Sequence, residues 1–180
     1  STADLVLPES SHYEGSTYFA IDTYDETTNP DGGMLRGRID FAVYDTQMYP
    51  DEFVGLDGYE APGEGQYVYA YQIFNYAEPW STEAVEVFRV LNFDGEGLIS
   101  PEGTTWTGDN DAVEPGMSPE EGVWVFDKYT LIQDTKSVLL VYSSDYDWVE
   151  GTYEIEPVKD DAFPVPEVPE PSTIALFAIG

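Results

Sequence analysis

Oxygen-bearing side chains clustered on turns are the first residues here whose types and spacing suit a chemical task. Asp109, Asn110 and Asp111 follow directly after a glycine, and Asn29 and Asp31 stand just before two glycines. Oxygen ligands on turns suit Ca²⁺. Neither cluster has the alternating ligands and twelfth-position Glu of an EF-hand loop, and ordinary polar turns use the same residues. A calcium site at Asp109, Asn110 and Asp111 and a plain turn both stay open, and no other cofactor is predicted.

Tryptophan side chains offer a second chemistry, the binding of sugars. Trp and Tyr present flat apolar rings with a polar handle. Trp80 and Trp106 lie in loop-like sequence, where they are free to contact a sugar, and Trp148 is a further candidate. Trp124 stands in an alternating segment and is predicted to be part of the core. A surface-anchored carbohydrate-binding module associated with exopolysaccharide is therefore one predicted function, with Trp80 and Trp106 as its sugar contacts.

Catalytic constellations are poorly represented. His12 is the only histidine, the chain has no cysteine, and no Gly-x-Ser-x-Gly nucleophile motif occurs. A glycosidase needs two carboxylates at a defined separation. With 36 Asp and Glu residues in the chain, no motif isolates such a pair. The sequence therefore predicts that the protein is not an enzyme, and that His12 has a structural or incidental role.

Charge narrows the choice of partners. Thirty-six acidic against six basic residues give a formal net charge of −30. Such a chain repels nucleic acid and anionic lipid, so neither is predicted as a partner. Hydrophobic residues make up 42% and aromatic residues 15% of the chain, far from the composition of a disordered protein. Stability without cysteine has to come from packing, metal ions or assembly rather than from disulfides.

The elements that would position these residues are strands. Period-2 alternation recurs between Gly, Pro, Asn and Asp clusters, and no window has an apolar stripe at helical period. The pattern predicts a β-sandwich of seven to nine strands, Ig-like or jelly-roll-like, over residues 1–162. Residues 94–121 are turn-rich, with one short strand around 104–107. The predicted strands are 17–23, 35–44, 66–75, 85–93, 123–126, 137–143 and 151–156.

The end of the chain differs from the rest. Residues 163–171 hold four prolines and predict an extended linker of roughly 28 Å, at about 3.1 Å per residue. Residues 172–180 are uncharged, mostly apolar, and too short to span a bilayer, which takes about 20 residues. Both faces of this tail are apolar, as in strands covered on two sides. The side chains expected to be buried are Ile174, Leu176, Phe177 and Ile179.

Those features predict a donor strand that completes the sheet of a neighbouring copy. A head-to-tail contact that does not close generates a filament. The main functional hypothesis is therefore a structural subunit of an extracellular fibre or biofilm-matrix filament whose partner is itself. A truncated membrane anchor and a strand folded back onto its own sandwich stay open. It is also open whether the N-terminal run 3–7 takes part in the exchange.

The tail also carries a family resemblance. Val168-Pro169-Glu170-Pro171-Ser172-Thr173, followed by an apolar segment, resembles the start of a PEP-CTERM sorting signal. That signal continues through a full apolar helix into a basic cluster, which this sequence does not show. The resemblance implies an exported protein of the cell surface or extracellular matrix. The opening at Ser1, with no visible signal peptide, fits a mature chain after export.

Overall fold

The chain folds into strands without helices over the residues that the structure describes. The computed structural model describes residues 6–52, 65–91, 112–117, 121–126 and 131–157, with the backbone alone for 112–117 and 121. The strands are β1 (Tyr13–Asp22), β2 (Met34–Asp45), β3 (Tyr67–Asn75), β4 (Val85–Leu91), β5 (Ala112–Met117), β6 (Glu121–Phe126), β7 (Thr135–Lys136), β8 (Leu140–Ser144) and β9 (Thr152–Pro157).

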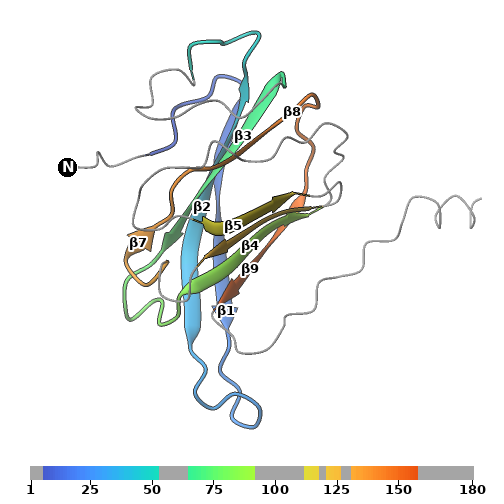
Figure 1. Ribbon diagram of the computed structural model, residues 1–180. Helices are drawn as coiled ribbons and strands as arrows, with labels where there is room; N and C mark the ends of the chain where they lie inside the picture. The colour runs from blue at the N-terminus through green and yellow to red at the C-terminus, as the bar shows by residue number, and fades with distance from the viewer. Residues whose placement is uncertain (1–5, 53–64, 92–111, 118–120, 127–130, 158–180) are drawn as a thin grey trace, which may run out of the picture.

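Two antiparallel sheets face each other, which confirms the predicted all-β sandwich. The first sheet has the order β1-β2-β3-β7, with β8 also paired to β3, and the second has the order β5-β6-β4-β9. The strands of the second sheet run obliquely across the first (Figure 1). In the first sheet one cross-strand row runs from Gly15 through Phe41 and Tyr71 to Leu140. The predicted boundary between residues 162 and 163 lies outside the described residues.

The main core fills the space between the sheets. Leu35 and Ile39 of β2 and Ile73 of β3 contribute from the first sheet. Phe88 and Trp124 contribute from the second, and Trp124 is completely buried, as predicted. The remaining members are Phe19, Val85, Phe126, Leu131, Val138, Leu140, Tyr142 and Ile155. Within the strands, the core side chains alternate with residues of the opposite face. The sequence shows this alternation as a period-2 pattern.

The first sheet is also covered on its outer face, around the ends of β2 and β3. A second buried cluster comprises Ala42, Tyr44, Val68, Ala70, Leu139 and Val141. Leu7 packs against this cluster, and the Tyr44 hydroxyl donates to the carbonyl oxygen of Pro8 at 2.7 Å. β3 therefore has buried residues on both faces, Ile73 in the main core and Val68 and Ala70 in this second cluster. Leu7 therefore contributes to the fold of its own chain; residues 3–5 of the N-terminal run lie outside the described residues.

Several strands differ from the sequence prediction: β7 (Thr135–Lys136) was not predicted, β8 begins at Leu140 rather than at residue 137, and β5 and β1 differ more widely. β5 lies within 94–121, which we had interpreted as turns apart from residues 104–107, because Pro115 and Gly116 usually break strands. A proline is tolerated on an edge strand, and β5 is an edge of its sheet. β1 begins at Tyr13 rather than at residue 17, since Gly15 and Ser16 also looked like turn residues. Gly15 has a packing reason instead: a Cβ there would meet the Phe41 ring at 2.8 Å.

Polar turn chemistry accounts for Asn29 in the oxygen-rich cluster of Asn29 and Asp31. The Asn29 side-chain amide donates to the carbonyl oxygen of Thr23 at 2.6 Å, and the Gly32 N–H donates to the Asn29 carbonyl at 3.0 Å. These contacts close the connection between β1 and β2. The Asp25 carboxylate accepts the backbone N–H groups of Thr28 and Thr27, which lowers its pKa. Asn29 is therefore occupied in holding a turn.

Candidate ligand-binding cleft

A cleft opens between the sheets at the end where β8 leads into β9. Its volume is about 760 Å³, within the range of about 300–1,000 Å³ typical of small-molecule sites. Aromatic side chains dominate the described lining, together with residues of the connection 145–151. The lining is Tyr13, Thr17, Ile39, Phe41, Ala42, Val43, Tyr69, Tyr71, Phe88, Val90, Leu91, Tyr142, Ser144, Tyr146, Asp147, Trp148, Val149, Glu150, Gly151, Thr152 and Tyr153.

The floor of the cleft is built by cross-strand register on the inner face of the first sheet. Tyr69 pairs with Tyr142 across the β3–β8 ladder, and Tyr71 pairs with Phe41 across the β2–β3 ladder. Directly opposed residues point to the same face of a sheet. The rings of Tyr69 and Tyr142 accordingly stack with centroids 4.9 Å apart and 5° between their planes. The strand pairing thus collects rings that lie far apart in the sequence.

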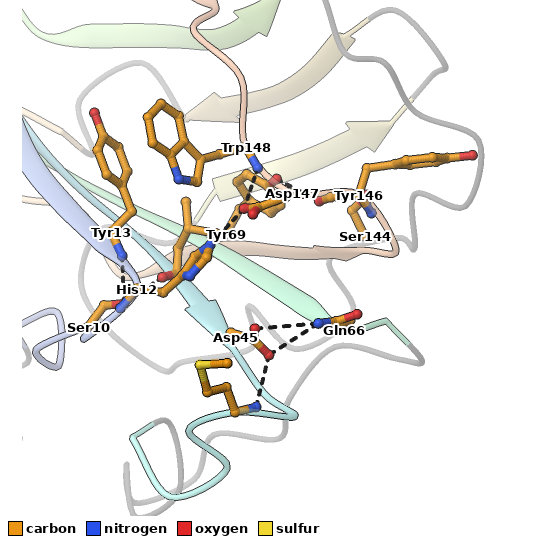
Figure 2. A network of polar contacts seen from close by, with 12 residues as sticks. Ser10, His12, Tyr13, Asp45, Gln66, Tyr69, Ser144, Tyr146, Asp147 and Trp148 are labelled. Atoms are coloured by element: carbon orange, nitrogen blue, oxygen red, sulfur yellow. Dashed lines mark hydrogen bonds and ion pairs between the residues drawn. The ribbon is translucent and has the colours of Figure 1, made fainter.

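The connection 145–151, called here the cleft wall, is tied to the first sheet at three successive residues (Figure 2). The Tyr69 hydroxyl donates to the carbonyl oxygen of Tyr146 at 2.8 Å. His12 Nε2 lies 2.7 Å from the Asp147 carboxylate. The Trp148 indole stacks on the Tyr13 ring, with centroids 3.9 Å apart and 16° between the planes. Three different kinds of contact therefore hold the wall over the floor.

The tyrosines of the floor are neutral and keep polar handles inside the cleft. Burial raises the pKa of Tyr71 to about 12. Burial is also the main cause of the raised pKa of Tyr69 and of the strongly raised pKa of Tyr142. The Tyr71 and Tyr142 hydroxyl oxygens are 3.0 Å apart, close enough to share a hydrogen bond. A neutral phenol both donates and accepts hydrogen bonds, so these groups suit a ligand that carries hydroxyls.

The charged side chains of the described cleft lining are all acidic. Asp147 and Glu150 are its only ionisable side chains other than tyrosine, and neither lysine nor arginine is among the described lining residues. Asp147 already accepts from His12 and from the Trp148 backbone N–H, the latter at 2.7 Å. An anionic ligand would meet uncompensated negative charge here. A neutral ligand would meet hydroxyls, rings and one uncommitted carboxylate.

Of the sequence-predicted sugar contacts, the structure places one, and it lies elsewhere. Trp80 is 68% exposed on the connection between β3 and β4 and does not line the cleft. Trp106 and the calcium candidates Asp109, Asn110 and Asp111 lie outside the described residues. So do the donor-strand residues, namely Ile174, Leu176, Phe177 and Ile179.

The residues that build the cleft went largely unrecognised in the sequence. Trp148 was only a further candidate, because Trp80 and Trp106 lie in loop-like sequence and were preferred as sugar contacts. Tyr67, Tyr69 and Tyr71 alternate along the predicted strand 66–75, and this row of tyrosines in place of aliphatic residues is the signal that the sequence offers. A tyrosine-lined face needs partners for its hydroxyls, so it is poorly suited to a dry core.

Comparisons with protein-family models, with curated proteins and with solved structures each returned no match. The fold and the cleft are therefore interpreted from their own geometry. No helix among the described residues is long and apolar enough to cross a membrane. Within the same residues, no three His, Asp or Glu side chains come together as a metal site. The resemblance of residues 168–173 to a sorting signal stays a prediction, since these residues are not described.

Proposed function

We propose that this protein binds a neutral carbohydrate chain in the cleft between its sheets and acts as a non-catalytic component of a cell surface or extracellular matrix. The observation that carries the proposal is the stacked, tyrosine-rich cleft under the cleft wall. Its rings supply flat apolar surface, and its hydroxyls supply donors and acceptors in the same place. Sugars present the same combination of apolar ring faces and hydroxyl edges.

The charge pattern favours a neutral sugar over a uronic, sulfated or phosphorylated one. The whole chain carries −30, and the described cleft lining adds two carboxylates and no basic side chain. Like charges brought together in a partly desolvated site cost several kcal/mol. Hydroxyl groups on a neutral sugar can instead donate to Glu150 and to the tyrosine oxygens. Exclusion of anionic polymers is therefore part of the proposal.

Binding fits the geometry better than cleavage. Hydrolysis of a glycosidic bond uses one carboxyl as acid and a second as base or nucleophile. Asp147 Oδ1 accepts from both His12 and the Trp148 backbone N–H, so this carboxylate helps to hold the cleft wall. Glu150 is then the one uncommitted carboxylate of the described lining. We therefore propose sugar binding without turnover.

The proposed location follows from the sorting-signal resemblance at residues 168–173 and from the composition. Outside the cell, a chain without cysteines has to take its stability from packing, metal ions or assembly, because it can form no disulfides. The predicted role as a filament subunit is compatible with sugar binding, because a matrix fibre and its polysaccharide occupy the same space.

Two exposed tryptophans provide a matched test. Trp148 lies in the cleft and is 39% exposed, whereas Trp80 lies outside it and is 68% exposed. We would measure retardation of the full chain by affinity electrophoresis in gels containing neutral glucans, mannans or galactans, with alginate as the anionic polymer. The wild-type protein and Trp80→Ala should be retarded by one class of neutral polymer. Trp148→Ala should lose at least about ten-fold in affinity, and alginate should retard none of them.

Three results would overturn the proposal. One is the absence of binding to every neutral polymer. Another is loss of binding in Trp80→Ala together with retention in Trp148→Ala. The third is a preference for cationic chitosan that disappears in 1 M salt, because salt screens attraction between exposed charges. That result would assign recognition to the −30 surface rather than to the rings. Far-UV circular dichroism of both variants confirms that they are folded.

A further inference from the structure

The first sheet ends in a long, regular edge. β1 pairs with β2 over ten consecutive residues without a bulge, and among the described residues no strand pairs with its other side. An unpaired edge presents a row of backbone N–H and C=O groups that accepts another strand. Natural edges are blunted by prolines, bulges or charged side chains, lysine above all. β1 has no proline, bulge or lysine, and its two charged residues, Glu14 and Asp22, stand near its ends.

The outward-facing groups of β1 can be assigned from its ladder. In an antiparallel pair, alternate residues exchange both hydrogen bonds with the partner strand, and the residues between them point away. The Thr23 N–H donates to the Gly33 carbonyl at 2.9 Å. Because every second residue bonds to the partner strand, the odd-numbered residues of β1 are the ones whose backbone groups bond to β2. The carbonyl of Tyr18 instead accepts from the Tyr153 hydroxyl at 3.4 Å. The even-numbered residues 14–22 therefore direct their backbone groups outward.

A second copy of β1 is a poor occupant of this edge. If two β1 strands paired antiparallel about Tyr18, Glu14 of each copy would face Asp22 of the other. Like charges directly opposed across a strand pair are destabilising, and each chain already carries −30. The occupant that fits best is an uncharged strand. Within this chain the segment 172–179 has that character, since it contains no charged residue and is apolar on both faces.

We propose that the β1 edge accepts residues 172–179 of a neighbouring copy as an added strand, joining subunits head-to-tail. β9 (Thr152–Pro157) contacts β1 through Tyr153, so the last described strand passes beside the edge strand before the chain continues at residue 158. Fourteen residues, 158–171, then separate the domain from the added strand and reach roughly 43 Å if extended at about 3.1 Å each. Their four prolines stiffen this spacer, which favours a neighbouring edge over the chain's own.

The geometry supplies variants that act on the edge alone. Ala20 is exposed, and its N–H points away from β2. Ala20→Pro therefore removes an outward donor and leaves the β1–β2 ladder bonds in place. Ala20→Val is the matched control, because it keeps the N–H and suits a strand. Phe177→Asp places a charge in the added strand and leaves the edge unchanged.

Sedimentation velocity of the full-length proteins in 1 M NaCl tests the proposal, since that salt concentration shortens the screening length to about 3 Å. Wild type and Ala20→Val should form concentration-dependent oligomers. Ala20→Pro and Phe177→Asp should each associate at least ten-fold more weakly. A mixture of these two should form a one-to-one complex, because one keeps a working strand and the other a working edge. That rescue also shows that both variants are folded.

Two outcomes would overturn the inference. A wild-type protein that stays monomeric up to high concentration would mean that the strand is not exchanged between copies. Oligomers of Ala20→Pro equal to those of wild type would mean that assembly uses another surface. Neither outcome bears on the sugar proposal, because Ala20 is not among the described residues that line the cleft.

Discussion

The same strands build both ends of the space between the sheets, but one end is a packed core and the other contains a cleft. At one end Leu35 of β2 and Ile73 of β3 are completely buried. At the other end the same two strands carry Phe41 and Tyr69, and a cleft of about 760 Å³ remains. The change from branched aliphatic side chains to rings along a single strand therefore separates a packed core from a candidate binding site.

The physical reason lies in how the two kinds of side chain fill space. Aliphatic side chains interdigitate to the density of an organic crystal. Rings prefer offset-stacked or edge-to-face contact with each other, and they need partners for their hydroxyls. In the cleft they stack in pairs, Tyr69 on Tyr142 and Tyr13 on Trp148. Such pairs form walls and leave a volume between them.

The largest expected effect comes from opening a cavity in the packed end. Leu35→Ala should lower the free energy of unfolding by about 2–5 kcal/mol, as large-to-small core substitutions do. Equilibrium urea unfolding, followed by circular dichroism, measures it. Val149→Ala in the cleft wall is the control, because Val149 is 69% exposed and its truncation should change stability by less than about 0.5 kcal/mol. Equal losses of unfolding free energy in both variants would contradict the proposed difference between the packed end and the cleft end.

Alkaline pH should act on the tyrosines of the cleft floor. Burial raises the pKa of Tyr71 to about 12, above the ordinary value of 10.0. Stabilisation from the neutral phenol is therefore complete below pH 10 and is lost as the pH rises through the folded-state pKa near 12. Unfolding should accompany ionisation in that interval, and both are measurable by tyrosinate absorbance and circular dichroism. Because exposed tyrosines such as Tyr18 absorb as well, the Tyr71 signal is the difference from Tyr71→Phe. Titration of that signal near pH 10 in a folded protein would contradict the burial of this ring.

The Tyr13–Trp148 stack should matter more for ligand affinity than for folding. Tyr13→Ala removes one face of the stack, and aromatic pairs contribute about 0.5–1.5 kcal/mol beyond their buried area. We expect a drop in stability of about 1 kcal/mol and at least a ten-fold loss of affinity for the neutral polymer that binds wild type. Tyr18→Ala is the control, since Tyr18 is 68% exposed and does not line the cleft. Unchanged affinity in Tyr13→Ala would remove this ring from the site.

The smallest effect is expected at the contact between His12 and Asp147. The side chains are 22% and 48% exposed, and pairs of this kind contribute about 0–1 kcal/mol. His12→Gln should therefore change the free energy of unfolding by no more than about 1 kcal/mol in urea titrations. Ligand affinity should fall only slightly, because Tyr69 and Tyr13 still hold the cleft wall. Complete loss of binding would show that this contact alone positions the wall.

Strand identity was predictable wherever alternation was strict. β2 and β3 were predicted to within one residue at 35–44 and 66–75, because Ile39 and Val43 alternate with residues of the opposite face and the same period continues in β3. β5 was missed because Pro115 and Gly116 favour turns locally, and its edge position, which tolerates them, is a property of the whole sheet. A local sequence pattern predicts which side chains of a strand share a face, but not which strands pair with it.

The cleft could not be predicted from the sequence, because it depends on which strands lie next to each other. Tyr69 and Tyr142 meet because β3 pairs with β8, and no local pattern specifies that pairing. Trp148 reaches Tyr13 only because the connection after β8 crosses back over the start of β1. The tyrosine-rich face of β3 was visible in the sequence, whereas its partners were set by topology.

The central claim is that sugar is bound by the rings of the cleft, and intermolecular nuclear Overhauser effects test it most directly. The probes are cellohexaose, laminarihexaose and mannohexaose, each added to the full-length protein. The account predicts contacts from sugar ring protons to the aromatic protons of Trp148 and Tyr13, and none to Trp80. Contacts to Trp80 or to the outer face of the first sheet, with the Trp148 resonances unmoved, would contradict it.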